Sequence, residues 1–340
     1  MLLRSHRVRT TAADEAIRKE FDRRLSRIPG RKPVRHVNTR DSSTPSLHFR
    51  FVDSNVYRDG VEPPDPEHII GCTKCKPNMG RFCGCEYPKD CECLEYARVD
   101  ETKLTDEERV RYAKAKRQGG STMGLPKNFP YAKETGLLVQ AYLDHRYPIY
   151  ECNDKCGCGG ICKTKVVQWG RKVGLEIFKT KDRGWGLRST EALLKGQFVD
   201  VYRGEVITNE EADRRQEQAE KTKESYLFSL DKFENIVKPL YLVDGEFMGG
   251  PARFINHSCE PNCAQYAVCY DRNNPYIYDI AIFAIRDIPA GKELTFDYLD
   301  VDLDDDGSKE DLDKRLRKEV EADSVSCKCR AKNCRRWLWK

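Results

Sequence analysis

Apolar residues near the start of the chain return at helical spacing. Four of them lie one or two helical turns apart: Ile17, Phe21, Leu25 and Ile28. This period predicts an amphipathic helix over residues 12–27, which Pro29 and Gly30 end. Residues 31–47 have no such period and are predicted to be loop, whereas residues 48–56 alternate enough to predict a strand.

The second half of the chain has the pattern of a β protein. From residue 166 onward, short apolar or aromatic runs predict strands at residues 176–180, 197–202, 226–230, 241–243, 277–285 and 293–296. Capping sequences predict two further helices, one between Thr105 and Gly119 and one from Thr208 to about residue 223. The fold is therefore predicted to be mostly β with short helices, in small sheets rather than one doubly wound sheet. Neither a G-x-G-x-x-G loop after a strand nor a P-loop lysine is present.

Length and composition predict about two domains with a real core, since the 340 residues are 39% hydrophobic. No stretch approaches the roughly 20 apolar residues of a membrane span, so no membrane contact is expected. The first residues have neither a long apolar run nor a small-residue cleavage site, so no secretory signal is predicted.

Charge is distributed unevenly along the chain. The net charge is +5, but residues 1–40 hold twelve Lys and Arg against four Asp and Glu, which leaves the rest about three units negative. A basic extension ahead of a mildly acidic body predicts contact with nucleic acid or an acidic surface. The alternative is a solvated basic helix without a partner. Residues 300–323 are almost all charged and predict a flexible linker.

Ten of the sixteen cysteines form two clusters of short spacing. Without a secretory signal, clustered cysteines are more typical of metal sites than of disulfides. Spacings of one to three residues let a tight turn direct successive thiolates at one ion, and structural zinc often takes four of them. The predicted zinc ligands are Cys72, Cys75, Cys83, Cys85, Cys91, Cys93, Cys152, Cys156, Cys158 and Cys162.

Residues 253–263 (RFINHSCEPNC) form an unusually polar segment. An amide, an imidazole, a hydroxyl and a thiol stand on four consecutive residues. Such a run buries no apolar face, so it predicts a ligand-contacting loop or a metal turn, against the plainer interpretation of an exposed polar loop.

The three cysteines at the end of the chain, Cys327, Cys329 and Cys334, leave one position of a zinc tetrahedron open. Either water or substrate fills it, as in catalytic zinc, or a distant cysteine does. The candidates for a distant ligand are Cys259 first, with Cys263 and Cys269 as rivals.

Four motifs, followed by the cysteine-bearing tail, resemble the SET-domain protein lysine methyltransferases. The motifs are IYECNDKCGCGGIC (149–162), KDRGWGLRS (181–189), RFINHSCEPNC (253–263) and ELTFDY (293–298). The chain is most similar to fungal members of the heterochromatin class, which methylates lysine 9 of histone H3, over about residues 50–340.

The resemblance implies a SET-domain fold with a pseudoknot, in which the segment at 253–263 is threaded under another one. The domains expected are a basic extension (1–47), a pre-SET zinc cluster (48–165) with a helical insertion (97–148), a SET domain (166–300), a charged linker (301–323) and a zinc-binding post-SET tail (324–340).

The resemblance also implies the ligands of this chain. The methyl donor would be S-adenosylmethionine, held by Gly184, Trp185, Gly186, Tyr226, Arg253, Phe254, Asn256, His257 and Trp339. Three zinc ions would lie in the pre-SET cluster. A fourth would join Cys259 to Cys327, Cys329 and Cys334.

Three aromatic residues are the catalytic candidates that the resemblance implies. Tyr298 would be the active-site phenol, Tyr202 a second wall of the lysine channel, and Phe296 the neighbour of the methyl-accepting nitrogen. An aromatic channel suits this chemistry, because the amine must be neutral although free lysine has a pKa of about 10.4. A phenyl ring at Phe296 leaves room for a methylated nitrogen to rotate, so products up to trimethyllysine are expected.

Two departures from the family pattern are visible. The family holds three pre-SET zinc ions with nine cysteines and this chain has ten, so either Cys83 or Cys85 is spare. Arg336 stands where the family usually has glycine, a departure that bears on the conformation of the tail and not on its ligands.

The expected partners are the N-terminal tail of histone H3, bound as an added strand, and chromatin, in the heterochromatin of the nucleus. Two other functions remain open: a zinc-rich chromatin-binding module with weak catalysis, and a zinc-dependent nucleic-acid-binding protein. The presence of Asn256, His257 and Tyr298 favours the enzyme.

Overall fold

The structure is a computed structural model that describes residues 10–79, 84–87, 89–95, 97–218, 225–233, 240–271, 273–299 and 325–338. Its helices are α1 (Ala12–Leu25), α2 (Asp106–Gln118), α3 (Gln140–His145) and α4 (Asn209–Gln218). Its strands are β1 (Val34–Val37), β2 (Arg50–Phe51), β3 (Val56–Tyr57), β4 (Ile149–Tyr150), β5 (Leu175–Lys179), β6 (Trp185–Ser189), β7 (Phe198–Tyr202), β8 (Glu205–Thr208), β9 (Leu227–Ser229), β10 (Tyr241–Asp244), β11 (Met248–Gly249), β12 (Asn256–His257), β13 (Cys263–Cys269), β14 (Asp279–Ala284) and β15 (Thr295–Phe296). The predicted mostly β fold with short helices is confirmed. In the described ranges, no helix combines the length and the apolar character that crossing a bilayer requires.

The N-terminal helix α1 belongs to the folded body of the protein. Thr11 caps it by accepting a hydrogen bond from the backbone N–H of Asp14. Phe21 and Leu25 are buried in the main core, as the helical period predicted, but Ile17 on the preceding turn is exposed. The buried stripe is therefore shorter than the sequence suggested.

Strand β1 lies in a segment that was predicted to be loop, so that prediction was wrong. It pairs in parallel with β5, which in turn pairs with β6. The four residues of β1 carry too little local pattern to identify a strand, and the pairing with a partner about 140 residues later decides their conformation.

The central sheet has the order β4-β13-β14-β7. Strands β7 and β14 confirm two predicted strands, whereas β13, which has the largest number of residues among the strands, was not predicted. It begins at Cys263, inside the polar segment, and it contains both Cys263 and Cys269. Both thiols are buried in the sheet. The two cysteines therefore act as small apolar residues of a buried strand and not as metal ligands.

A second sheet, β3-β8-β10-β9, lies beside the first and carries helix α4. Thr208 caps α4 by accepting from the backbone N–H of Glu211, as predicted, and the described part of the helix ends at Gln218. Among the described strands, β9 pairs only with β10, so no described strand lies on its other edge.

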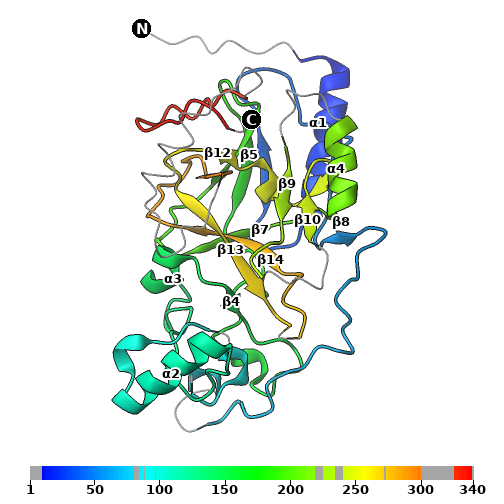
Figure 1. Ribbon diagram of the computed structural model, residues 1–340. Coiled ribbons are helices and arrows are strands. Elements are labelled where there is room, and N and C mark those ends of the chain that lie inside the picture. Colours follow the sequence, from blue (N-terminus) through cyan, green and yellow to red (C-terminus); the bar gives the residue numbers. More distant parts are fainter. Residues whose placement is uncertain are drawn as a thin grey trace.

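The cysteine-rich lobe with helix α2 lies at one end of the molecule, and the C-terminal tail lies near β5 and β12 at the other end (Figure 1). Helix α2 confirms its predicted bounds: Thr105 forms a capping box with Glu108, and Gly119 ends the helix in the left-handed region, with φ 63°. Val99, Leu104 and Leu125 form a small apolar cluster of their own. The insertion therefore has a separate minor core beside the cysteines.

Candidate active site and metal centres

The polar segment 253–263 crosses the molecule next to the ELTFDY motif. Strand β12 pairs in parallel with β15, and Asn262 extends the contact: its side-chain amide donates to the carbonyl of Glu293 (2.8 Å) and accepts from the N–H of Thr295 (2.8 Å). Asn256 donates to the carbonyl of Trp185 (3.0 Å) and to the Glu293 carboxylate (2.8 Å). The segment is thus fixed between two others that are distant in sequence.

The glycines of the Gly184-Trp185-Gly186 turn each have a steric reason. Gly184 has φ 64°, which favours glycine. A Cβ on Gly186 would lie 2.8 Å from the Glu293 carboxylate, which receives the amide of Asn256. The fold itself therefore accounts for both glycines, and it brings the carbonyl of Trp185 to the polar segment.

A hollow of about 540 Å³, open to solvent, lies where this turn, the polar segment and the C-terminal tail meet. The predicted residues Asn256, His257 and Tyr298 line it, together with Asp182 and Arg183, which were not predicted. The tail closes the opposite side with Val325, Ser326, Cys327, Lys328, Cys329 and Leu338. The other predicted cofactor residues in the described ranges do not line this hollow, and Trp339 lies outside the described residues.

Three of those other residues form an adjacent cluster. The guanidinium of Arg253 lies over the ring of Tyr226 (4.1 Å to the centroid) and also faces Phe49 and Phe254. Trp185 packs against His36, with 5.1 Å between ring centroids. These side chains pack next to the segment that carries Asn256 and His257, and they do not line the hollow.

The three predicted catalytic aromatic residues lie together with a fourth, Phe228, which was not predicted. Tyr202 contacts Phe228 (4.6 Å between centroids), Phe228 contacts Phe296 (5.6 Å), and Phe296 contacts Tyr298 (4.9 Å). Tyr202 and Phe296 are buried, while Tyr298 is partly exposed in the hollow. The four rings form a continuous row of contacts, which we call the aromatic channel.

Backbone carbonyls fix both phenols of the aromatic channel. The hydroxyl of Tyr202 donates to the carbonyl of Tyr226 (2.8 Å), and that of Tyr298 donates to the carbonyl of Ile255 (2.7 Å). Burial raises the pKa of Tyr202 well above its usual value, so this phenol stays neutral. Both oxygens keep lone pairs directed away from the carbonyls they bind.

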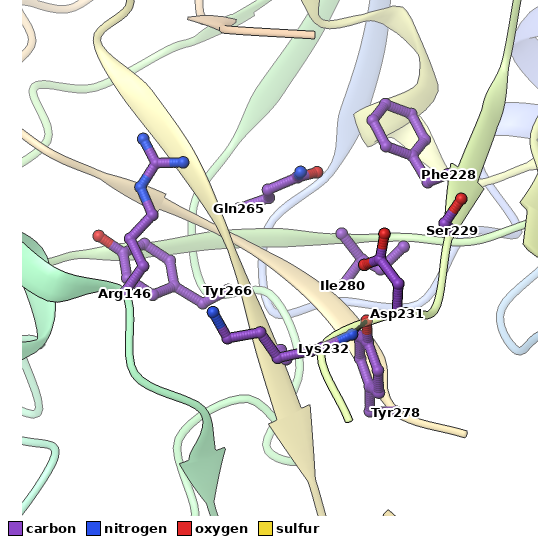
Figure 2. Close-up of a pocket in the computed structure, with 10 residues that line it drawn as sticks. Arg146, Phe228, Ser229, Asp231, Lys232, Gln265, Tyr266, Tyr278 and Ile280 are labelled. Atoms are coloured by element: carbon purple, nitrogen blue, oxygen red, sulfur yellow. Dashed lines mark hydrogen bonds between the residues drawn. The ribbon is translucent and has the colours of Figure 1, made fainter. Parts of the chain in front are cut away.

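A second hollow adjoins the other end of the aromatic channel. Phe228, Ser229, Asp231 and Lys232 form one side, and Gln265, Tyr266 and Arg146 form the other (Figure 2). The side-chain amide oxygen of Gln265 (Oε1) and the hydroxyl of Tyr266 are buried, and they have no hydrogen-bond partner in the described part of the protein. Buried polar groups are normally paired, so these two oxygens remain available as hydrogen-bond acceptors.

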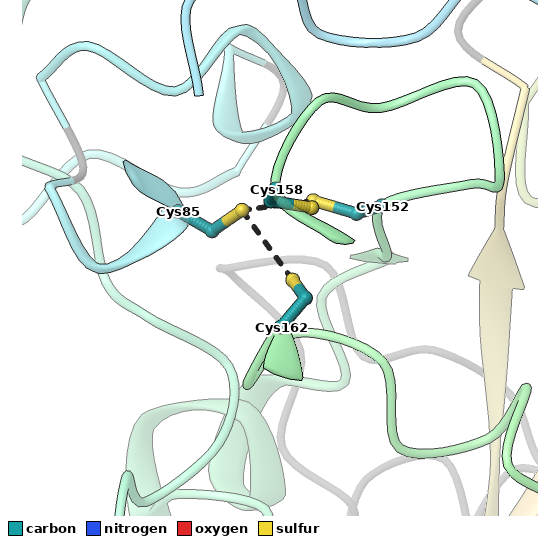
Figure 3. Close-up of side chains that lie close together, drawn as sticks. All are labelled: Cys85, Cys152, Cys158 and Cys162. Atoms are coloured by element: carbon teal, nitrogen blue, oxygen red, sulfur yellow. Dashed lines mark hydrogen bonds between the residues drawn. The ribbon is translucent and has the colours of Figure 1, made fainter. Parts of the chain in front are cut away.

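The described cysteines of the first two clusters come together in one lobe. The sulfurs of Cys85, Cys152, Cys158 and Cys162 all lie within 4.8 Å of one another (Figure 3). Two further groups meet the same limit: Cys72, Cys75 and Cys91, and Cys91, Cys93 and Cys152. Cys156 joins them through a 3.4 Å contact with the sulfur of Cys93. Four thiolates around one zinc ion would be about 3.8 Å apart, so these sets fit bridged zinc sites.

The three tail cysteines lie beside Cys259 of the polar segment. Cys327, Cys329 and Cys334 lie with Cys259 in one group within 4.8 Å, which makes a set of four thiols. The rivals Cys263 and Cys269 lie in strand β13 and are not part of this group. The geometry therefore favours a closed four-thiolate site over a catalytic zinc with an open position.

A buried ion pair holds the tail in addition. The Arg335 guanidinium donates two hydrogen bonds to the Asp297 carboxylate, and both side chains are less than 5% exposed. Burial alone would raise the pKa of Asp297, but Arg335 outweighs it and the pKa is lowered. His257 lies between this pair and the thiols, with its Nε2 3.2 Å from the sulfur of Cys259.

Several contributors were not identified from the sequence. Phe228 lay in a predicted strand without a signal for its role. Arg183, which donates to the carbonyl of His257 and pairs with Glu293, stood inside a quoted motif, so its motif position was the available signal. Arg335 and Asp297 are 38 residues apart, and no local pattern connects them.

Comparison with known proteins identifies the family. The Pre-SET motif matches residues 26–165 and the SET domain matches residues 184–299. The chain is 40% identical over 322 residues to the H3 lysine-9 specific histone-lysine N-methyltransferase KMT1 of Fusarium mangiferae, covering 90% of this chain and 88% of that protein. It is 39% identical, with the same coverage, to the H3 lysine-9 specific enzyme dim-5 of Neurospora crassa.

Solved structures agree. The Neurospora SET domain protein DIM-5, a histone lysine methyltransferase, is 36% identical with a TM-score of 0.61, covering 82% of this chain and 99% of that one. KRYPTONITE in complex with mCHH DNA, an H3(1–15) peptide and SAH is 27% identical, with a TM-score of 0.61 and coverage of 91% and 52%. The chain therefore belongs to the SET-domain histone-lysine N-methyltransferases of the H3 lysine-9 class, which are S-adenosylmethionine-dependent enzymes.

Proposed function

We propose that this protein transfers methyl groups from S-adenosylmethionine to lysine 9 of histone H3. The observation that carries the proposal is the aromatic channel, a row of contacting rings that reaches from one hollow to another: Tyr298 lines the hollow beside the tail, and Phe228 lines the other. A lysine side chain entering from the peptide side would pass Phe296 and bring its nitrogen to Tyr298. Methyl transfer needs this arrangement, because donor and acceptor must approach in line from opposite sides.

The hollow beside the tail is the proposed cofactor site. Its polar lining by Asn256, His257 and Arg183 suits the charged methionine part and the adenosine of the donor. When bound, S-adenosylmethionine supplies an electrophilic methyl group on a positive sulfur. The predicted Gly184, Gly186, Tyr226 and Arg253 support this site from the adjoining segments.

The residues of the aromatic channel promote the reaction by desolvation and orientation. Four aromatic walls disfavour a charged ammonium and lower the pKa of the entering lysine. The oxygens of Tyr202 and Tyr298, held by their carbonyl partners, orient the neutral amine. Tyr298 serves as an orienting group rather than as a strong base, because an ordinary phenol has a pKa of about 10.

The hollow at Phe228 is the proposed peptide site. Strand β9 borders this hollow, and no described strand pairs with its outer edge, so an extended histone tail can add there as a further strand. The unpaired oxygens of Gln265 and Tyr266 and the carboxylate of Asp231 offer acceptors to the N–H groups and basic side chains of such a peptide.

The cysteine groups are proposed to hold four zinc ions, three in the pre-SET lobe and one at the tail. Nine described cysteines gather in the lobe, and nine is the number that the family uses, so Cys83 is the proposed spare residue; it lies outside the described residues. We expect a chelator to release the tail site first, because three of its four cysteines are only partly buried. The measurement is zinc release against methyl transfer; full activity after loss of the tail zinc would contradict this assignment.

We further propose that the protein acts on nucleosomes in nuclear heterochromatin and that its basic extension contacts DNA. Deleting residues 1–40 would not test this contact cleanly, because Phe21 and Leu25 are part of the core. Replacing the exposed Lys19 and Arg27 by glutamine should weaken DNA binding and reduce its salt dependence. Unchanged binding would favour the solvated helix.

The test of the main proposal is incubation with methyl-labelled cofactor and H3 peptides in which one lysine at a time is replaced. Label should disappear only when lysine 9 is replaced. Tyr298→Phe should reduce transfer strongly, whereas the matched control Tyr57→Phe, on the surface, should not. Binding of cofactor and peptide without transfer would instead support the catalytically weak chromatin-binding module.

A further inference from the structure

A wide groove lies where the cysteine-rich lobe meets the segment that leads into β5. Residues 77–78, 132–136 and 160–172 contribute most of its lining, and it encloses about 1450 Å³ of space open to solvent. None of its lining residues belongs to the aromatic channel or to the two hollows at its ends. The groove therefore serves no step of the proposed methyl transfer.

Trp169 is the large apolar side chain of this groove, and it is 46% exposed. Tryptophan is highly buried on average, since its ring is the largest apolar group that a chain has. A single exposed apolar residue needs no special explanation. Trp169 differs from an ordinary exposed apolar residue because several positively charged side chains line the same groove.

Five cationic residues line the groove against two acidic ones. Within the lining, Lys133 lies 3.9 Å from Glu86, and Lys165 pairs with Asp154 outside it (2.9 Å). The remaining cations are exposed and have no ion pair in the described part of the chain: Arg31, Lys163 and Lys172. The two acidic residues of the lining are Glu86, which lies near Lys133, and Glu134.

We propose that this groove binds single-stranded RNA. The exposed indole of Trp169 offers a face on which an unpaired base can stack, and the three exposed cations can follow the phosphates on either side. The amide of Asn78 and the hydroxyl of Thr135 in the same lining are suitable partners for 2′-hydroxyl groups. An acidic peptide would use the cations but has no base to stack on the indole, and a duplex does not present unstacked bases.

The test is fluorescence anisotropy of a labelled single-stranded RNA of mixed sequence with the intact protein. Trp169→Ala should weaken binding roughly 5- to 150-fold, the range expected for one stacked base, while Trp169→Phe should retain most of the affinity. Lys163→Gln with Lys172→Gln should lower the slope of log affinity against log salt by about 1.4, since two phosphate contacts are lost. Methylation of a short H3 peptide should be unchanged in all three variants, which shows that they are folded.

Controls separate the groove from general attraction of polyanions. Lys114→Gln with Lys195→Gln removes the same charge from exposed positions elsewhere and should leave RNA binding within about twofold. Three results would overturn the proposal: equal affinity for duplex DNA, full competition by a poly-glutamate peptide, or no effect of Trp169→Ala. Equal affinity for single-stranded DNA would overturn the preference for RNA.

Discussion

Replacement of Arg335 by leucine should detach the C-terminal tail from the SET core. Arg335 is 3% and Asp297 4% exposed in their side chains, so solvent screens the pair little. Removing one partner of a buried pair costs about 3–5 kcal/mol, because the other charge stays buried without compensation. That cost corresponds to a factor of roughly 10² to 5 × 10³ in the docking equilibrium of the tail.

The loss should appear as local opening rather than as global unfolding. None of the described tail residues belongs to the main core, and the proposed zinc would still join the tail thiols to Cys259. Hydrogen exchange of residues 325–338 should therefore accelerate while the central sheet stays protected. Methyl transfer should fall roughly 10- to 100-fold, since the proposed zinc would offset part of the cost.

The chain offers a matched control for this experiment. Arg330 lies on the same tail and pairs with Asp182, but it is 62% exposed. An exposed pair contributes about 0–1 kcal/mol, so Arg330→Leu should have little effect. The double variant Arg335→Leu with Asp297→Leu should recover part of the tail protection, because no unpaired charge is left. If Arg335→Leu opens the tail no more than Arg330→Leu does, the reasoning is refuted.

The pH dependence of the pair follows from the direction of its pKa shift. The pKa of Asp297 is lower in the folded protein than its usual value, so the pair stabilises the tail above that usual value and loses its effect only as pH falls through the folded value. The effect of Arg335→Leu should therefore be constant from roughly pH 6 to pH 9.

Three other predictions concern separate parts of the molecule. Phe296→Tyr should shift products toward monomethyllysine, because the added phenol can bind the amine or a water and hinder rotation of a methylated nitrogen. The products are measured by mass spectrometry, and an unchanged mixture of methylation states would contradict the role of Phe296. Arg336 has φ 75°, so Arg336→Gly should relieve about 1 kcal/mol of strain and raise the protection of the tail in hydrogen exchange; faster exchange would show that the arginine side chain matters more than its backbone. Burial lowers the pKa of His36 to about 4, so His36 lowers the free energy of unfolding by up to about 3 kcal/mol as pH falls from about 6.5 to 4. His36→Phe should remove that part of the acid sensitivity in denaturant titrations, and an unchanged pH profile would exclude this role.

The features that the sequence predicted well are those with local causes. Thr105 and Glu108 can satisfy the first N–H groups of a helix by themselves, and the observed capping box shows that they do. Closely spaced cysteines similarly have few ways to arrange their sulfurs, so the nearness of Cys72 to Cys75 and of Cys158 to Cys162 followed from spacing. Such predictions need no knowledge of where the rest of the chain lies.

The features that were missed depend on partners far along the chain. Strand β1 exists because β5 pairs with it, and β13 because β14 and β4 flank it. Phe228 became recognisable as a wall of the aromatic channel only when β9 was placed beside Phe296. Sequence patterns report which face of an element is apolar, but they do not report which distant face it meets.

The tail contains a residue in an unfavourable backbone conformation that other contacts maintain. At Arg336 the sequence departs from the glycine usual in the family, and the structure retains the left-handed backbone that glycine would favour. Two hydrogen bonds keep it there: its N–H donates to the sulfur of Cys334, and its carbonyl accepts from the N–H of Cys327. Both partners belong to the four-thiol group, so the site that would hold the metal also determines the backbone at residue 336. A strained residue between two such ligands is stable only while the thiols stay together, and the tail should therefore tolerate Arg336 with zinc bound and lose its order without it.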